Sequence, residues 1–261
     1  MKFMKRALQN FVTQLVPVYR EINHYKRVTR QNGFVGLASN TLKINNHNEM
    51  KHIVVIIHLF TLFISNGFAQ ETNYRPGLFF REDWKETPAE IPLSQKHVNN
   101  PDLLVLFYGP GQDSLKKSNH EKPVDDPFYV WSGLCLGNWM VTLKHKTNNV
   151  DLTGFAKISW RSKQAGLRQL RIALKLANGT WLVSDQFDDA TKDWRIREFN
   201  IQDIVWYKLD SKSVVEIGPV TNPDLSNVEE IGFTDLMPGG KSASCSRLDW
   251  IEVYGKPVKR M

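Results

Sequence analysis

The second half of the sequence alternates between apolar and polar positions with the period of a β-strand. The clearest case is 167–176, where every second residue from Leu170 to Leu176 is Leu or Ile and the residues between them are polar or small. Asn178-Gly179 separates this segment from the next apolar run at 180–186. An Asn-Gly pair between two such runs is typical of a two-residue β-hairpin, so the pattern predicts two antiparallel strands here.

Short segments of this kind recur along most of the chain, and glycine, proline and asparagine separate them. Almost no stretch has the apolar spacing of a helix. The pattern therefore predicts an all-β protein, a sandwich or a barrel. The predicted strands are 77–84, 103–108, 128–131, 139–146, 155–161, 167–176, 180–186, 194–201, 204–209, 228–233 and 246–254.

The last predicted strand, 246–254, has apolar and charged residues on both of its faces. Such a strand suits a sandwich, in which one sheet face packs on the core and the other meets solvent. Strict alternation puts Arg247, Asp249, Ile251 and Val253 on one face and Leu248, Trp250, Glu252 and Tyr254 on the other.

Four stretches resemble the galactose-binding-like β-sandwich, the jelly-roll fold common among carbohydrate-binding modules. They are VDLTGF at 150–155, DLSNV at 224–228, IGF at 231–233 and LDWIEVYG at 248–255. The resemblance covers roughly the last half of the chain. It implies a single antiparallel β-sandwich of jelly-roll type that binds carbohydrate, although one fold hosts many activities.

The N-terminal part has a different character. Residues 1–49 carry eight basic and two acidic residues, and a run of about a dozen apolar residues follows at 53–64. With Gly67 and Ala69 placed for cleavage, 50–69 is predicted to be a secretory signal peptide. The run is shorter than the ~20 residues of a membrane span. Residues 1–49 are then an extension or a mis-assigned start, with an amphipathic segment before a signal anchor as the alternative.

With this signal peptide removed, 70–261 is expected to be a single secreted or periplasmic domain. The net charge of this domain then differs from that of the whole chain. The chain has a net charge of +7, but all of it lies in residues 1–51, and the remainder has equal numbers of basic and acidic residues. A basic surface for nucleic acid is therefore not expected. We also expect no membrane attachment after cleavage, and a monomer.

The exported part holds all eight tryptophans, and segment 139–208 holds twelve basic against seven acidic residues. Sugar rings stack on Trp and Tyr, and arginine pairs with carboxylate or sulfate groups. We therefore expect carbohydrate binding, with an anionic polysaccharide as the finer expectation. For each residue singly, the alternative is a place in the core or on a solvated strand face. The predicted ligand-binding residues are Trp160, Arg161, Arg171, Trp181, Trp194, Arg195 and Arg197.

The two cysteines, Cys135 and Cys245, both lie in the exported part. Two cysteines in an oxidising compartment often form a disulfide. The resemblance implies that the first and last strands are neighbours, which favours a disulfide between Cys135 and Cys245. The alternative is two buried free thiols. Asp185, Asp188 and Asp189 crowd one loop and are candidates for a structural calcium ion, with a solvated acidic loop as the alternative. No other cofactor is expected.

No recognised catalytic motif is present, so we expect binding without catalysis. His120, Tyr129 and His145 are the candidate catalytic residues if the chain is a polysaccharide lyase or glycoside hydrolase on the same scaffold. A third alternative is a structural or adhesion domain whose tryptophan-rich face binds another protein.

Overall fold

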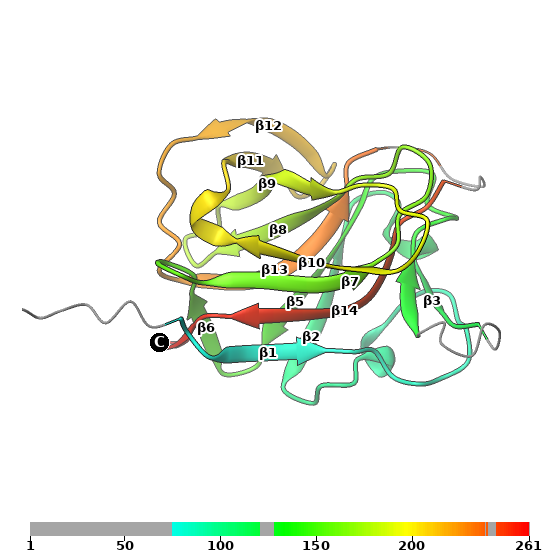
Figure 1. Cartoon of the computed structure of the whole chain (residues 1–261), viewed down its shortest axis with the longest axis horizontal. Helices are drawn as coiled ribbons and strands as arrows, with labels where there is room; N and C mark the ends of the chain where they lie inside the picture. Colours follow the sequence, from blue (N-terminus) through cyan, green and yellow to red (C-terminus); the bar gives the residue numbers. More distant parts are fainter. Residues whose placement is uncertain (1–74, 121–127, 238, 240–243, 261) are drawn as a thin grey trace, which may run out of the picture. The chain divides into compact units, whose positions relative to one another are not determined.

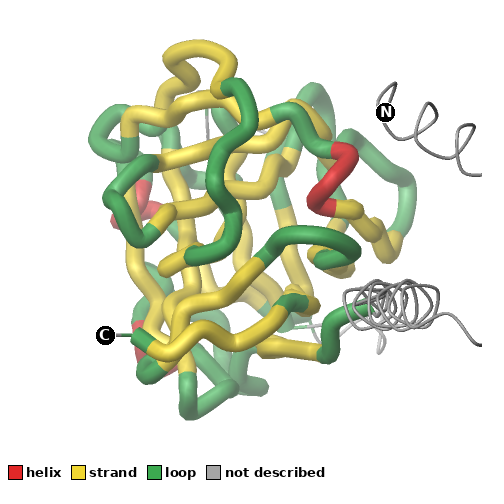
Figure 2. The backbone as a smooth tube through the Cα atoms, turned by 90° about the vertical axis from the view of Figure 1, so that its left-hand side faces the viewer, coloured by secondary structure: helices red, strands yellow, loops and turns green. Residues whose placement is uncertain are grey.

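The computed structural model describes residues 75–120, 128–237, 239 and 244–260, which form two β-sheets (Figures 1 and 2). The chain divides into two units, 1–69 and 70–261, and every described residue belongs to the second. The predicted extension (1–49) and signal peptide (50–69) lie outside the described residues. Within the described ranges, no helix is long and apolar enough to cross a membrane.

Sheet A has six strands and lies in front in Figure 1. Its order is β10-β7-β14-β4-β3, and β1 pairs with the other end of β14 on the side where β4 pairs. All of these pairs are antiparallel. The strands are β1 (Leu78–Glu82), β3 (Lys116–Ser118), β4 (Tyr129–Trp131), β7 (Lys157–Ser162), β10 (Arg195–Asn200) and β14 (Arg247–Tyr254).

Sheet B has nine strands in the order β12-β11-β9-β8-β13-β5-β2, and β6 joins it by pairing with β13 and β15. Short 3-10 turns η1 (Gln95–His97), η2 (Gln112–Ser114) and η3 (Ile201–Asp203) lie in the connections. The strands are β2 (Leu103–Tyr108), β5 (Trp139–His145), β6 (Asn148–Asp151), β8 (Leu170–Leu176), β9 (Trp181–Asp188), β11 (Trp206–Asp210), β12 (Val215–Val220), β13 (Val228–Asp235) and β15 (Lys256–Lys259).

The core lies between the two sheets and confirms the predicted antiparallel β-sandwich. Trp160 and Ile251 of sheet A belong to the same buried cluster as Ile172 and Phe233 of sheet B. The alternation predicted for 170–176 is also confirmed, because the Leu and Ile positions of β8 all enter this cluster. Each sheet therefore presents one face to the core and one face away from it.

The alternation predicted for the last strand is wrong for the residues that precede Trp250. The register of β14 against β7 shifts between Leu248 and Trp250, which marks a β-bulge. Leu248 is therefore buried together with Ile251 and Val253, whereas Trp250 lies on the outer face. The strands that the sequence pattern did not predict are β3, β6, β12 and β15, which are short or have exposed residues in alternation.

Candidate functional site

The structure separates the predicted ligand-binding residues onto different surfaces. Trp160 on β7 has no exposed surface, and its indole N–H donates to the carboxylate of Asp188 at 3.1 Å. Its ring also packs edge-on against Phe199, with 4.8 Å between centroids. Trp160 is therefore a core residue, and its ring is closed to a sugar in this conformation.

Two of the predicted residues, Arg161 and Trp194, lie together on the outer side of sheet A. The guanidinium of Arg161 lies 5.3 Å from the Trp194 ring and donates to Asp249 at 2.8 Å. Trp194 also meets the ring of Tyr129 edge-on at 5.3 Å. The cation is thus already paired with a ring and a carboxylate of the protein.

Arg195 and Arg197 on β10 lie on the face of sheet A that points toward the core. In the register of β10 with β7, Arg197 is opposite the core residue Trp160, and Arg195 is opposite Ser162. Arg195 donates to the carboxylates of Asp188 and Asp189. The guanidinium of Arg197 lies 5.2 Å from the Phe199 ring. Neither arginine shares a surface with Arg161.

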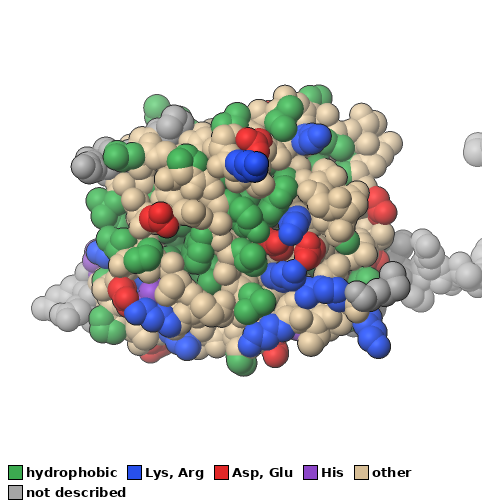
Figure 3. All heavy atoms as spheres, turned by 180° about the vertical axis from the view of Figure 1, so that it is seen from behind, with side chains coloured by type: hydrophobic (Ala, Val, Ile, Leu, Met, Phe, Trp, Pro, Cys, Tyr) green, Lys and Arg blue, Asp and Glu red, His purple; other side chains and the backbone are tan. Residues whose placement is uncertain are grey.

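The remaining two, Arg171 and Trp181, lie on the face of sheet B that points away from the core. This outer face of sheet B is built by alternation, because β8 sends Arg171, Ala173 and Lys175 to it while its Leu and Ile residues enter the core. Figure 3, seen from behind relative to Figure 1, shows hydrophobic side chains gathered on this side with charged side chains of both signs beside them.

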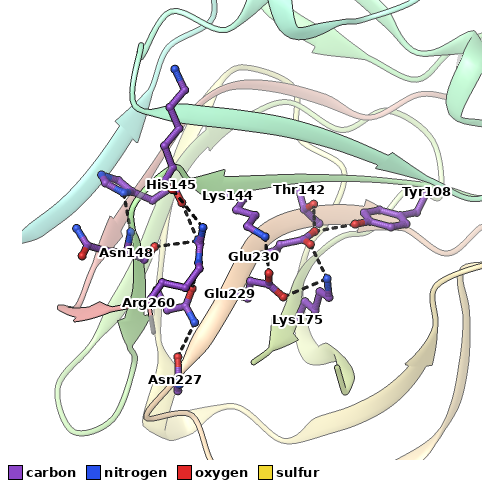
Figure 4. A network of polar contacts seen from close by, with 12 residues as sticks. Tyr108, Thr142, Lys144, His145, Asn148, Lys175, Asn227, Glu229, Glu230 and Arg260 are labelled. Atoms are coloured by element: carbon purple, nitrogen blue, oxygen red, sulfur yellow. Dashed lines mark hydrogen bonds and ion pairs between the residues drawn. The ribbon is translucent and has the colours of Figure 1, made fainter. Parts of the chain in front are cut away.

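A buried glutamate, Glu230 of β13, organises the polar part of this face (Figure 4). Its side chain is 1% exposed, and it accepts hydrogen bonds from the hydroxyls of Tyr108 at 2.9 Å and Thr142 at 2.6 Å. The ammonium group of Lys175 donates to its other oxygen at 3.0 Å. Three different strands thus converge on one carboxylate.

The neighbouring Glu229 extends this network toward solvent. It pairs with Lys175 at 3.1 Å and with Lys144, so that two lysines and two glutamates balance in charge. Burial acts to raise the pKa of Glu229, but the bonds from Lys144 and Lys175 outweigh it and lower that pKa. Burial acts to lower the pKa of Lys175, but its bonds to the two glutamates raise it above the ordinary value. Glu229 and Lys175 therefore remain charged at neutral pH.

Two aromatic rings lie above this network. Tyr108 on β2 and Trp181 on β9 meet edge to face with their centroids 4.7 Å apart, although three strands separate β2 from β9 in the sheet. The ammonium group of Lys175 lies 5.8 Å from the Trp181 ring. Both rings pack against a second buried cluster, formed by Met140, Ala173, Val183, Leu209 and Val214.

Burial raises the pKa of the Tyr108 hydroxyl, and the negative charge of Glu230 adds to this effect. Tyr108 therefore keeps its proton and donates a hydrogen bond to Glu230 rather than acting as an anionic base. The network positions an aromatic pair over polar groups that are satisfied by one another. Within the described part of this network, each lysine and each glutamate is paired with an opposite charge.

The candidate catalytic residues do not form one group. His120 stacks on Tyr129 of sheet A, with centroids 5.6 Å apart, and Tyr129 is itself buried. His145 is at the end of β5 in sheet B, where its ring accepts from the backbone N–H groups of Thr147 and Asn148, both at 3.2 Å. Its carbonyl accepts from Arg260 at 2.8 Å (Figure 4).

The predicted disulfide is not formed. Cys135 and Cys245 are both buried, and no disulfide joins them in the structure. Burial raises the pKa of the Cys135 thiol to about 12. The structure thus agrees with the alternative that both cysteines are buried thiols.

Of the three candidate calcium ligands, Asp188 is fully buried and is bonded to Trp160, Ser162 and Arg195. Asp185 accepts from the backbone N–H of Val205 at 2.9 Å, and Asp189 pairs with Arg195. Among the described residues, no group of three or more His, Cys, Asp or Glu side chains is arranged to hold a metal ion.

Sequence reasoning missed the residues that organise this face, Tyr108, Thr142 and Glu230. Tyr108 ends a predicted strand, and Glu229-Glu230 interrupts an apolar run, which is the only signal in the sequence. Glu230 points to the outer face of sheet B because the register of β13 with β8 shifts between Val228 and Glu230. A bulge of this kind has no signature in the period-2 pattern.

No protein-family model matches the chain, and no curated protein matches it. Among solved structures, the chain is similar to a family 11 carbohydrate-binding module from Clostridium thermocellum in complex with a β-1,3-1,4-mixed-linked tetrasaccharide: 16% identity, TM-score 0.39, covering 67% of this chain and 99% of the module. It is also similar to the family 11 module of a cellulosomal cellulase of that organism: 14% identity, TM-score 0.38, covering 66% of this chain and 96% of the module. An exo-β-agarase matches at 11% identity and a TM-score of 0.36, covering 67% of this chain and 25% of the enzyme.

Proposed function

We propose that this protein is a non-catalytic carbohydrate-binding domain and that its ligand lies against Trp181 and Tyr108 on the outer face of sheet B. The observation that carries the proposal is the pair of rings 4.7 Å apart, held by the Glu230 network on the sheet face away from the core. Sugar rings offer polarised C–H groups to such ring faces, and the surrounding polar groups fix orientation.

The polar groups nearest to solvent are those of Lys144, Lys175 and Glu229, whose side chains are 19–25% exposed. Sugar hydroxyls both donate and accept hydrogen bonds, so they match a mixed row of ammonium and carboxylate groups. The rings supply contact area, and the row of charges would select among hydroxyl arrangements.

Charge balance at this face supports a neutral glycan rather than the anionic polysaccharide expected from the sequence. Lys175 and Lys144 pair with Glu229 and Glu230, and Arg171 pairs with Glu216 at 2.8 Å. An anionic ligand would compete with these carboxylates for the same cations. Binding of a neutral glycan should depend little on salt, because exposed ionic contacts are the ones that salt screens.

The proposal includes export, with cleavage after Ala69, as the sequence pattern predicts. The mature protein would then meet glycans outside the cytoplasm. Intact mass of the exported protein tests this part separately, since retention of 53–64 in the mature species would contradict it.

The test is calorimetry of the purified protein with mixed-linked β-1,3-1,4 tetrasaccharide, agar oligosaccharides and a sulfated polysaccharide. Trp181→Ala should weaken binding roughly 5- to 150-fold, the effect of losing about 1–3 kcal/mol of stacking by analogy with stacking on nucleic-acid bases. Trp250→Ala is the matched control, because Trp250 is a half-buried ring beside a cation, Arg81 at 4.5 Å, on the other sheet.

Equal loss of binding in both variants, or loss only in Trp250→Ala, would assign the ligand to a different surface. Tighter binding of the sulfated polysaccharide, with an affinity that falls at high salt, would instead support the anionic polysaccharide expected from the sequence. Release of reducing ends or unsaturated uronates during incubation would make the protein an enzyme.

A further inference from the structure

One end of the outer face of sheet B is bridged by the connection between β11 and β12, residues 211–214, which we call the strap. The strap starts at one edge of the sheet, whereas β5 and β2 form the other edge. Nevertheless, the side-chain amide of Asn138, which precedes β5, donates to the carbonyl of Val214 at 2.8 Å. A Cβ atom added to Gly109, just after β2, would lie 2.5 Å from the Val214 side chain. The strap therefore reaches across the whole face.

The strap is a built structure rather than a loose loop. Val214 is fully buried and has φ = 53°, a conformation that is costly for a β-branched residue and persists only where the surroundings fix it. The carboxylate of Asp210 accepts from the backbone N–H of Lys212 at 3.1 Å and from the hydroxyl of Ser213 at 2.5 Å. These bonds hold the turn in shape.

A second link, near the strap, joins β12 to the middle of the sheet. Arg171 of β8 pairs with Glu216 of β12 at 2.8 Å, and its guanidinium lies 6.0 Å from the ring of Tyr207 on β11. Arg171 also donates to the carbonyl of Ser184. The ion pair thus ties β12 to the middle of the sheet, and the Asn138–Val214 bond ties the strap to the far margin.

Along the strands of sheet B, the side chains of the outer face are buried near the strap and partly exposed at the opposite end. At the strap end, Met140 of β5 and Ala173 of β8 are fully buried although they point away from the core. At the other end of the same strands, the side chains of Lys144 and Lys175 are 23% and 25% exposed. Leu104, at the open end of β2, is 38% exposed.

We infer that a glycan lying along the strands enters from the open end, between Lys144 and Lys175, and cannot continue past the closed end formed by the Tyr108–Trp181 contact and the strap. The protein then recognises the ends of glycan chains and excludes chain interiors, which would have to pass through this closed end. This inference rests on the proposed function and narrows its ligand to chain termini.

The test is the stoichiometry of binding, measured by calorimetry with the full protein and size-fractionated mixed-linked β-1,3-1,4-glucans and agar oligosaccharides. Recognition of an end gives one bound protein per chain at every chain length, with the same molar affinity for the tetrasaccharide and the polymer. Several bound proteins per chain, rising with length, would overturn the inference. Absence of binding to every length would overturn the inference together with the proposed function, so the two failures are distinguishable.

Discussion

Replacing Glu230 by alanine should destabilise the fold far more than changing the adjacent Glu229. The Glu230 carboxylate is 1% exposed and serves Tyr108, Thr142 and Lys175. Its removal leaves the buried hydroxyl of Thr142 without its acceptor, at a cost of about 1–3 kcal/mol. It also removes the acceptor of Tyr108 and one of the two carboxylates that pair with Lys175, so the total loss should be about 3–5 kcal/mol.

Two further variants separate charge from shape. Glu230→Gln keeps the volume and one acceptor oxygen but sets an amide against Lys175, so we expect a loss of about 1.5–3 kcal/mol, one charge-assisted hydrogen bond. Glu229→Gln is the matched control, because its side chain is 19% exposed and its pairs with Lys144 and Lys175 are half-exposed. Its loss should stay below about 1 kcal/mol.

The assay is urea-induced unfolding followed by tryptophan fluorescence, with the free energy extrapolated to water. The predicted order of stability is wild type, Glu229→Gln, Glu230→Gln and then Glu230→Ala. A Glu230→Ala protein within about 1 kcal/mol of wild type would refute the claim that this carboxylate organises the face. Glu229→Gln falling as far as Glu230→Ala would refute the distinction between the two positions.

Three further predictions concern other parts of the fold. Burial raises the pKa of Asp249 from 3.8 to about 6 despite Arg161, so the folded state binds its proton more tightly than the unfolded state. The unfolding free energy of the wild type should therefore fall, relative to that of Asp249→Asn, by up to about 3 kcal/mol as the pH rises from about 4 to about 6. A difference between the two proteins that stays constant across that range would contradict this. Thiol titration without reductant should find two reactive thiols in the unfolded chain and slow reaction of Cys135 in the native protein, whereas no thiols after unfolding would indicate a disulfide. Glu82 is buried and accepts from three backbone N–H groups, at 2.7, 2.7 and 2.9 Å, so Glu82→Ala should lower the unfolding free energy by about 3 kcal/mol or more, and a loss below about 1 kcal/mol would refute its role.

The fold was predictable wherever strands alternate without interruption. Segment 103–108 coincides with β2, and the alternation of 170–176 correctly separates core from surface in β8. The prediction fails at the bulge beside Leu248, because one extra residue reverses the facing of the preceding residues and leaves no mark in the composition. Edge strands such as β12 fail for a different reason: one side is open to solvent, which weakens the selection for apolar residues.

For the proposed binding site, the sequence predicted the types of residue, tryptophan beside basic residues, but not which tryptophan lies on the surface. Trp160 and Trp181 look alike in the sequence, each near arginines on a predicted strand, yet the first is buried in the core and the second lies on the outer face. What distinguishes them is the sheet to which each strand belongs and the side that faces the core. The strap is further from prediction, since the contact between Asn138 and Val214 joins residues 76 apart across the width of a sheet.

The most direct test of the central claim is a titration of ¹⁵N-labelled protein with mixed-linked β-1,3-1,4 tetrasaccharide or agar oligosaccharide, followed through the indole N–H signals of the eight tryptophans. A ligand on the outer face of sheet B should shift the signal of Trp181 and leave those of Trp194 and Trp250, on sheet A, unchanged. Shifts of Trp194 or Trp250 with a constant Trp181 signal would contradict the account.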